Sequence, residues 1–121
     1  MYTYSFEKLE VWKLAKALTI EIYGLTLQYP FDEKFLLVSQ MRRASISICS
    51  NLAEGNYRKT HADRVRFITI AYSSTLELLN HLIISYELGF VTIEKYTNVR
   101  NLIEELTAKV NAFSIAQKKP E

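Results

Sequence analysis

The residues best placed to do chemistry lie on one face of the segment at residues 33–54. Polar side chains recur there at three- and four-residue steps, which puts them on one side of a helix: Gln40, Arg43, Ser47, Asn51 and Glu54. An arginine beside a carboxylate can activate it for catalysis or can satisfy it as a hydrogen-bonded ion pair. The candidate carboxylate is Glu77, the only formal charge in residues 67–86.

The pairing of these residues follows from the expected register. If helices at 33–54 and 61–88 run antiparallel, paired positions add to about 117. Gln40 then lies opposite Glu77, and Arg43 lies within a turn of Ser74 and Glu77. Amide and hydroxyl neighbours satisfy hydrogen bonds but provide no set of nucleophile, base and orienting group. We therefore predict no catalytic residue and a structural polar network: Gln40, Arg43, Ser47, Asn51, Glu54, Ser74 and Glu77.

Within that network, Arg43 and Glu77 are predicted to form a partly or wholly buried ion pair, inside the chain or between subunits. No metal or cofactor site is predicted. Di-iron bundles use Glu-x-x-His pairs, whereas Glu77 and His81 are four residues apart. His81 is expected to serve helix packing or an interface. The three glycines form no cluster that could cradle a phosphate, and the lone Cys49 is most simply a small apolar residue.

A basic cluster is the best candidate for binding an anion. It comprises Arg58, Lys59, His61, Arg64 and Arg66, and Arg42 could extend it. It has two interpretations: a solvated turn and helix start, or a surface for nucleic-acid phosphates that a ring would repeat around one rim. Trp12, with Tyr2, Tyr4 and Phe6 nearby, is expected to anchor a core or an interface rather than to stack on bases.

Composition limits the class of protein. A chain of 121 residues with 49% hydrophobic content fits one domain, 1–121, and its net charge of +2 permits a local nucleic-acid surface without indicating one. No signal-peptide pattern begins the sequence, so the expected location is cytoplasmic. The apolar stretch at residues 67–86 carries too many polar residues for a membrane span, and a buried bundle helix is expected instead.

The elements that must position these residues are helical. Apolar residues at helical spacing predict helices at about 6–28, 33–54, 61–88 and 93–116, and no segment alternates as a strand would. Asp32 and Thr60 are the expected N-caps of the second and third helices, while Gly55 and Gly89 are expected to end them. Short connections favour an all-α, antiparallel up-down-up-down four-helix bundle with a frayed tail from residue 117.

Helical spacing predicts a core stripe on each helix. The stripes are Val11, Ala15, Leu18, Ile22 and Leu25 on the first helix, Leu37, Met41, Ala44, Ile48 and Leu52 on the second, and Val65, Ile68, Tyr72, Thr75, Leu79, Leu82 and Tyr86 on the third. Apolar residues outside these stripes predict self-association, because a monomer would expose them as a patch. Those residues are Phe35, Ile46, Cys49 and Ala53 on the second helix, and Phe67, Ile70 and Leu78 on the third.

Several motifs also carry a family resemblance over nearly the whole chain. They are Phe6-x-x-Leu9-x-Val11-Trp12, Tyr29-Pro30 followed by Glu33, Gln40-x-x-Arg43-Ala44-x-x-Ser47, Asn51-Leu-Ala-Glu54-Gly55-x-x-Arg58 and Ala71-x-x-Ser74-x-x-Glu77. With these motifs the chain resembles the bacterial four-helix-bundle proteins first noted as products of intervening sequences in 23S rRNA genes.

The resemblance implies an all-α homo-oligomer without established enzymatic activity. A similar fold occurs in the accessory variability protein of diversity-generating retroelements, a basic pentamer, so five subunits are the expected number. This chain has Cys49 where many relatives have Pro and Leu36 where they often have Gly, which predicts a straighter second helix. The strongly basic character of the retroelement protein is missing.

These observations lead to two hypotheses about function. The first is a non-enzymatic homo-oligomeric scaffold or adaptor, whose partner is another copy of itself. The alternative is an rRNA- or DNA-associated protein that uses the basic rim at Arg42, Arg58, Lys59, Arg64 and Arg66. No membrane and no small-molecule substrate is expected as a partner.

Overall fold

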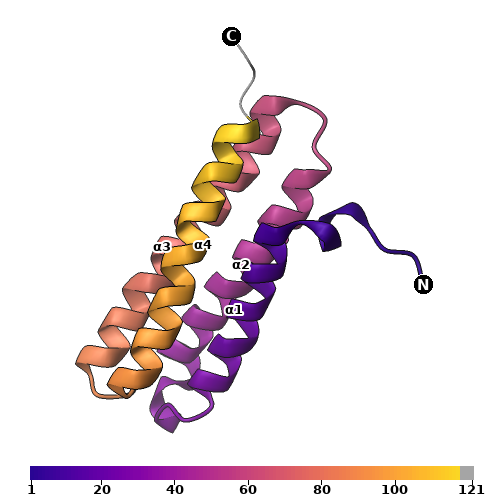
Figure 1. The fold of residues 1–121 in the computed structure, drawn as a ribbon. Helices are drawn as coiled ribbons and strands as arrows, with labels where there is room; N and C mark the ends of the chain where they lie inside the picture. The colour runs from indigo at the N-terminus through magenta and orange to yellow at the C-terminus, as the bar shows by residue number, and fades with distance from the viewer. Residues whose placement is uncertain (118–121) are drawn as a thin grey trace.

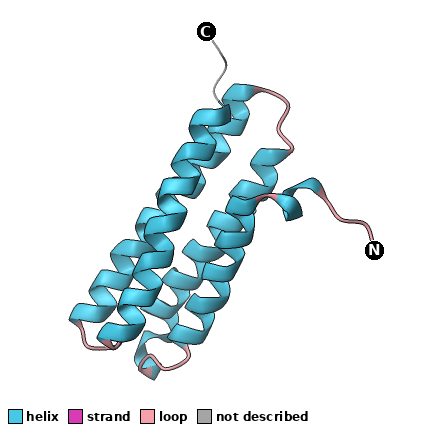
Figure 2. Cartoon of the chain, viewed as in Figure 1, coloured by secondary structure: helices cyan, strands magenta, loops and turns pink. Residues whose placement is uncertain are grey.

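Four long α-helices make up most of the chain (Figures 1 and 2). The computed structural model describes residues 1–117, and this range contains no strand. The helices are α1 (Glu10–Thr26), α2 (Ser39–Asn56), α3 (His61–Glu87) and α4 (Ile93–Gln117). The all-α prediction is confirmed. Residues 118–121, which belong to the tail that the sequence predicts to fray, lie outside the described residues.

Neighbouring helices run antiparallel. The last turn of α3 meets the first turn of α4, where the rings of Tyr86 and Tyr96 stack with centroids 4.5 Å apart. At the other end of the same pair, His61 Nδ1 lies 2.8 Å from the carbonyl oxygen of Gln117. α1 packs against α2 and α4, and α3 packs against α2 and α4, so the helices enclose one shared core (Figure 1).

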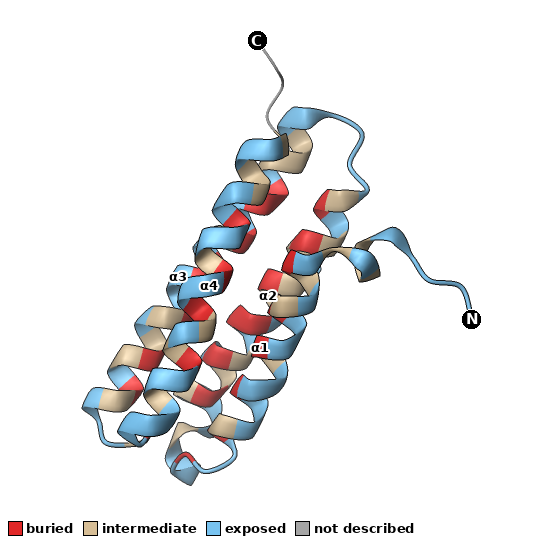
Figure 3. Cartoon of the chain, in the orientation of Figure 1, coloured by how far each residue is buried: buried red, intermediate tan, exposed pale blue. Residues whose placement is uncertain are grey.

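The core is a set of apolar stripes that face inward from all four helices (Figure 3). Burying one Leu or Ile side chain contributes about 1.5–3 kcal/mol, so this set dominates the stability of the bundle. The stripes predicted for α1 and α2 are confirmed at nearly every position. The residues that are almost completely buried include Leu18, Ile22, Met41, Ile48, Leu52, Ile68, Leu78, Leu82, Ile103, Leu106 and Val110.

The first helix begins later than predicted. A separate 3-10 turn spans Ser5–Lys8, and Leu9 adopts an extended conformation (φ −70°, ψ 125°) before α1 begins at Glu10. The extended residue redirects the chain, so that the N-terminal segment leaves the axis of α1 and crosses toward the end of α2 (Figure 1). Apolar residues recur at helical spacing across residues 6–28, so this break at Leu9 could not be predicted from the spacing.

The second helix is irregular where the sequence predicts a straight start. Phe31–Glu33 form a 3-10 turn and Lys34–Val38 a π-helical turn, in which Leu36 leaves helical geometry (φ −114°, ψ −106°). Asp32 makes no capping hydrogen bond, so its predicted N-cap role is wrong. The kink allows Tyr29 and Val38, on either side of it, both to reach the core. Leu36 in place of Gly therefore does not give the second helix a straight start, and whether this helix is straighter than in relatives stays a prediction.

Gly55 does not end α2 in a left-handed conformation, because no glycine except Gly89 has positive φ. It remains within the helix, and a Cβ at this position would lie 2.9 Å from the Cβ of Phe67 on α3. Gly55 therefore serves close helix packing. Gly89 (φ 82°) does end α3, and the Phe90 N–H donates to the Ser85 carbonyl at 3.0 Å. The predicted Thr60 cap is also confirmed, since its hydroxyl accepts from the Asp63 N–H at 3.1 Å.

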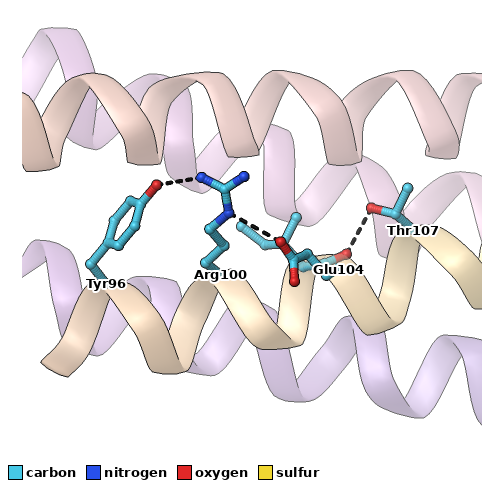
Figure 4. A network of polar contacts seen from close by, with 5 residues as sticks. Tyr96, Arg100, Glu104 and Thr107 are labelled. Carbon is cyan, nitrogen blue, oxygen red and sulfur yellow. Dashed lines mark hydrogen bonds and ion pairs between the residues drawn. The ribbon is translucent and has the colours of Figure 1, made fainter. Parts of the chain in front are cut away.

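A polar ladder runs along α4 at four-residue spacing (Figure 4). Arg100 donates to the Tyr96 hydroxyl at 2.6 Å and to Glu104 at 3.1 Å, and these hydrogen bonds raise the pKa of Arg100. Because Tyr96 also stacks on Tyr86 of α3, the ladder fixes the orientation of the ring that joins the two helices. Among the described helices, α3 alone has the length and hydropathy of a membrane span; it lies packed between α2 and α4.

Candidate functional site

Part of the predicted polar network forms between α2 and α3. The hydroxyls of Ser47 and Ser74 lie 2.9 Å apart, and Asn51 Nδ2 donates to the Ser47 carbonyl at 2.9 Å and to the Ser47 hydroxyl at 3.1 Å. Ser74 is buried, whereas Ser47 and Asn51 are partly exposed. These contacts connect two helices through mutually satisfied polar groups, which is a structural role.

The outer members of the network do not join it. Gln40, Arg43, Glu54 and Glu77 are exposed, and none of the ion pairs or side-chain hydrogen bonds within residues 1–117 connects Arg43 to Glu77. The buried pair predicted within the chain is therefore wrong. The observed register of α2 against α3 differs from the expected one by about one turn, since Ser47 lies opposite Ser74. The difference arises because α2 continues past Gly55 to Asn56. A pairing of Arg43 with Glu77 of another subunit stays a prediction.

The remaining groups with potential chemistry are engaged structurally. His81 Nδ1 lies 2.7 Å from the Glu77 carbonyl oxygen of its own helix. Burial raises the pKa of the Cys49 thiol, whose sulfur lies 3.3 Å from the Thr19 hydroxyl. The thiol therefore remains protonated at neutral pH, the less nucleophilic form. Within residues 1–117, no three His, Cys, Asp or Glu side chains are grouped as a metal site would require.

One arginine of the basic cluster is fixed by hydrogen bonds to the backbone, and two others are ordered by stacking on an aromatic ring. Arg64 donates to the carbonyls of Arg58 (2.7 Å) and Lys59 (3.3 Å), so it holds the turn between α2 and α3. The guanidinium carbons of Arg58 and Arg66 lie 4.2 and 5.4 Å from the ring centroid of Phe67. Stacking on an aromatic face orders a guanidinium without using its N–H donors.

Arg42 does not extend this cluster. Its Nε donates to the Thr26 hydroxyl at 3.0 Å, and its guanidinium lies 4.5 Å from the ring centroid of Tyr23 on α1. Arg42 lies near the start of α2, and Arg58 follows the end of this helix at Asn56; the helix between residues 42 and 56 is about 21 Å long at 1.5 Å per residue. Arg42 therefore belongs to the opposite end of the bundle.

An aromatic ladder lies at the same end of the bundle as the basic turn. Tyr2 packs edge-on against Tyr4 at 4.9 Å, Tyr4 stacks on Phe6 at 6.5 Å, and Phe6 packs edge-on against Trp12 at 5.0 Å. Tyr57, at the end of α2, packs against Phe6 at 6.3 Å. The sequence indicates the first four residues, but only the tertiary fold brings Tyr57 to them.

An exposed apolar surface occupies the opposite end, where α1 ends and α2 begins. It consists of Tyr23, Leu27, Phe31, Phe35 and Ile46, and we call it the apolar patch. Lys34 Nζ lies 6.0 Å from the Phe31 ring centroid and 5.5 Å from that of Phe35. Sequence spacing correctly indicated Phe35 and Ile46 but missed the others, because they come from separate elements.

Two residues predicted to lie outside the core are instead buried in it. Phe67 is in contact with α2 at Gly55, and Leu78 is completely buried, so neither supplies an exposed apolar surface. Ile70 on the same helix is exposed, as predicted. The reason is that α3 turns a different face to the core, one that includes the small residues Ala71, Ser74 and Ser85.

Comparisons with known proteins agree on the fold. A family model described as 23S rRNA-intervening sequence protein matches residues 7–112. A crystal structure at 1.70 Å of a protein with unknown function from the S23 ribosomal protein family of Bacteroides thetaiotaomicron VPI-5482 superposes with a TM-score of 0.78. It shares 20% sequence identity, and the alignment covers 86% of this chain and 97% of that one. No curated protein matches the sequence.

Proposed function

The chain belongs to the 23S rRNA-intervening sequence protein family, and from this premise we propose that it acts as a non-enzymatic homo-oligomeric scaffold. The observation that carries the proposal is the apolar patch. Leu27, Phe31 and Phe35 are 77%, 80% and 79% exposed. A contiguous patch of this kind is unusual on a monomer and typical of a surface that another protein covers.

The composition of the patch also suits a protein interface. Aromatic and arginine side chains are enriched at interface centres, where they contribute most of the binding energy. Here Arg42 is ordered against Tyr23, and Lys34 lies above Phe31 and Phe35. A second copy of the chain is the proposed occupant, because the family resemblance implies a homo-oligomer, with five subunits as the implied number.

Replacing Phe31 and Phe35 together by Ser is expected to convert the oligomer into monomers at micromolar concentration. The change removes two large apolar anchors from the proposed interface, and neither side chain contributes to the core of its own subunit. Light scattering coupled to size-exclusion chromatography measures the mass. Circular dichroism should show unchanged helix content.

Ile115→Ser is the matched control, because Ile115 is also exposed but lies near the end of α4, far from the patch. This variant should keep the mass of the unmodified protein. A stable monomer before any substitution, or an unchanged mass for the double variant, would refute the proposed role of the patch.

A second candidate function is association with nucleic acid. The observation that favours it is the pair of guanidiniums, Arg58 and Arg66, held against the ring of Phe67. Within residues 1–117, Arg58 makes no side-chain hydrogen bond, and Arg66 has only a 3.9 Å contact with Asp63. Their donors are therefore available to phosphate oxygens, which guanidinium binds in bidentate fashion.

Replacing Arg58 and Arg66 by Gln is expected to weaken RNA binding and to reduce its salt dependence. Each lost phosphate contact lowers the slope of log affinity against log salt by about 0.7–0.9. Fluorescence anisotropy with a labelled RNA over a salt series measures both effects. Lys95→Gln, at the opposite end of the bundle, is the control. An identical slope for the variant and the unmodified protein would remove these arginines from the interface.

A further inference from the structure

The aromatic ladder is ordered but not buried. Tyr2, Tyr4 and Tyr57 are 76%, 55% and 53% exposed, whereas Phe6 and Trp12 beneath them are half-buried. An unattached N-terminal segment with this composition would bury such rings or leave them in random orientations. Here the rings lie in sequence against one another and remain open to solvent.

Specific hydrogen bonds hold the ladder against α2. The backbone N–H of Ser5 donates to the Tyr57 hydroxyl at 3.2 Å, and Asn56 Nδ2 donates to the Ser5 hydroxyl at 2.8 Å. The backbone N–H of Tyr4 donates to the Glu7 carboxylate at 2.7 Å. This hydrogen bond also engages the nearest acidic side chain of the segment. The rings are therefore positioned before any partner arrives, which lowers the entropic cost of binding.

Positive charge lies next to the ladder. Arg58 and Lys59 directly follow Tyr57 in the turn, and the guanidinium of Arg58 is ordered on Phe67. At the base of the ladder, Lys16 Nζ lies 5.0 Å from the ring centroid of Trp12. Open aromatic faces beside ordered cations are the combination that binds single-stranded nucleic acids, because bases stack on the rings while phosphates pair with the cations.

We propose that the aromatic ladder is a platform on which unpaired bases of single-stranded RNA or DNA stack, with Arg58 and Lys59 binding the adjacent phosphates. This inference rests on the second candidate function and specifies its ligand. Duplex bases are already stacked on one another, so their faces cannot reach Tyr2, Tyr4 or Tyr57. The ladder therefore selects single strands, whereas Arg58 and Arg66 alone would bind phosphates of either form.

The test compares a labelled single strand of about 16 nucleotides with a duplex of the same length, at low salt, by fluorescence anisotropy. Tyr2→Ala with Tyr4→Ala should weaken binding of the single strand by about tenfold or more and leave duplex binding unchanged. Tyr57→Leu, which removes the ring at the other side of the ladder, should act in the same direction. Leu76→Ala, which truncates an exposed side chain of α3 outside both the ladder and the apolar patch, should change neither affinity.

A second measurement uses the only tryptophan of the chain. Trp12 packs on Phe6 within the ladder, so saturating single strand should change its fluorescence, and duplex should not. If every tyrosine variant binds the single strand as tightly as the unmodified protein does, the platform is overturned and the second candidate function is left intact. Absence of binding to either form would overturn both. Binding of an uncharged proline-rich peptide in place of the single strand would assign the ladder to peptide recognition and overturn the proposal.

Discussion

Replacing Leu78 by Ala is expected to lower the free energy of unfolding by about 2–5 kcal/mol. Leu78 is 0% exposed in the middle of α3, so truncation removes buried methyl groups and leaves a cavity that the bundle can only partly close. Leu76, two residues earlier on the same helix, is 44% exposed. Leu76→Ala should change the free energy of unfolding by about 0.5 kcal/mol or less.

Urea denaturation of the two variants, at one fixed protein concentration, measures the difference. The concentration must be fixed because association stabilises the folded state by mass action. The slope of the transition should stay unchanged, so that a shift of the midpoint reports stability alone. Comparable losses for the two variants would mean that Leu78 does not lie in the core.

Leu78 also shows why the core of α3 could be predicted only in part. Helical spacing correctly indicated Ile68, Thr75 and Leu82, which are buried. However, apolar residues occupy most faces of this helix, so the same period fits more than one phase. The inward face includes Ser74 and Ser85, whose burial hydrophobicity does not indicate. Only the packing of α2 and α4 against α3 decides which face is inside.

The candidate surfaces, too, could be predicted from the sequence only in part. Features that depend on neighbouring residues were predictable: Thr60 caps α3 and Gly89 ends it. Features that depend on tertiary contact were not, as with Tyr57, which reaches Ser5 over a sequence separation of 52. The Arg43–Glu77 pairing failed for a related reason. Both side chains are exposed and neither lies in the contact between α2 and α3, because spacing along each helix does not fix how the helix is rotated about its own axis.

The close approach at Gly55 leads to the second large effect. Gly55→Ala is expected to destabilise the protein by about 1–3 kcal/mol, although alanine is normally the better helix residue. The added Cβ would lie 2.9 Å from the Cβ of Phe67. A Cβ cannot rotate away as the end of a long side chain can, so α2 and α3 must separate. Separation would also disturb the Arg58 and Arg66 guanidiniums that stack on Phe67.

Gly24→Ala on α1 is the matched control. It makes the same chemical change within a helix, but nothing lies within 4 Å of the new Cβ. This variant should gain about 0.5–1 kcal/mol, because alanine loses less backbone entropy than glycine on folding. The two variants should therefore shift the thermal midpoint in opposite directions. If both raise it, the contact between Gly55 and Phe67 is not tight, and the helices can accept a side chain there. If Gly55→Ala alone lowers it and also weakens RNA binding, the close packing of α2 on α3 is what holds the two arginines in position.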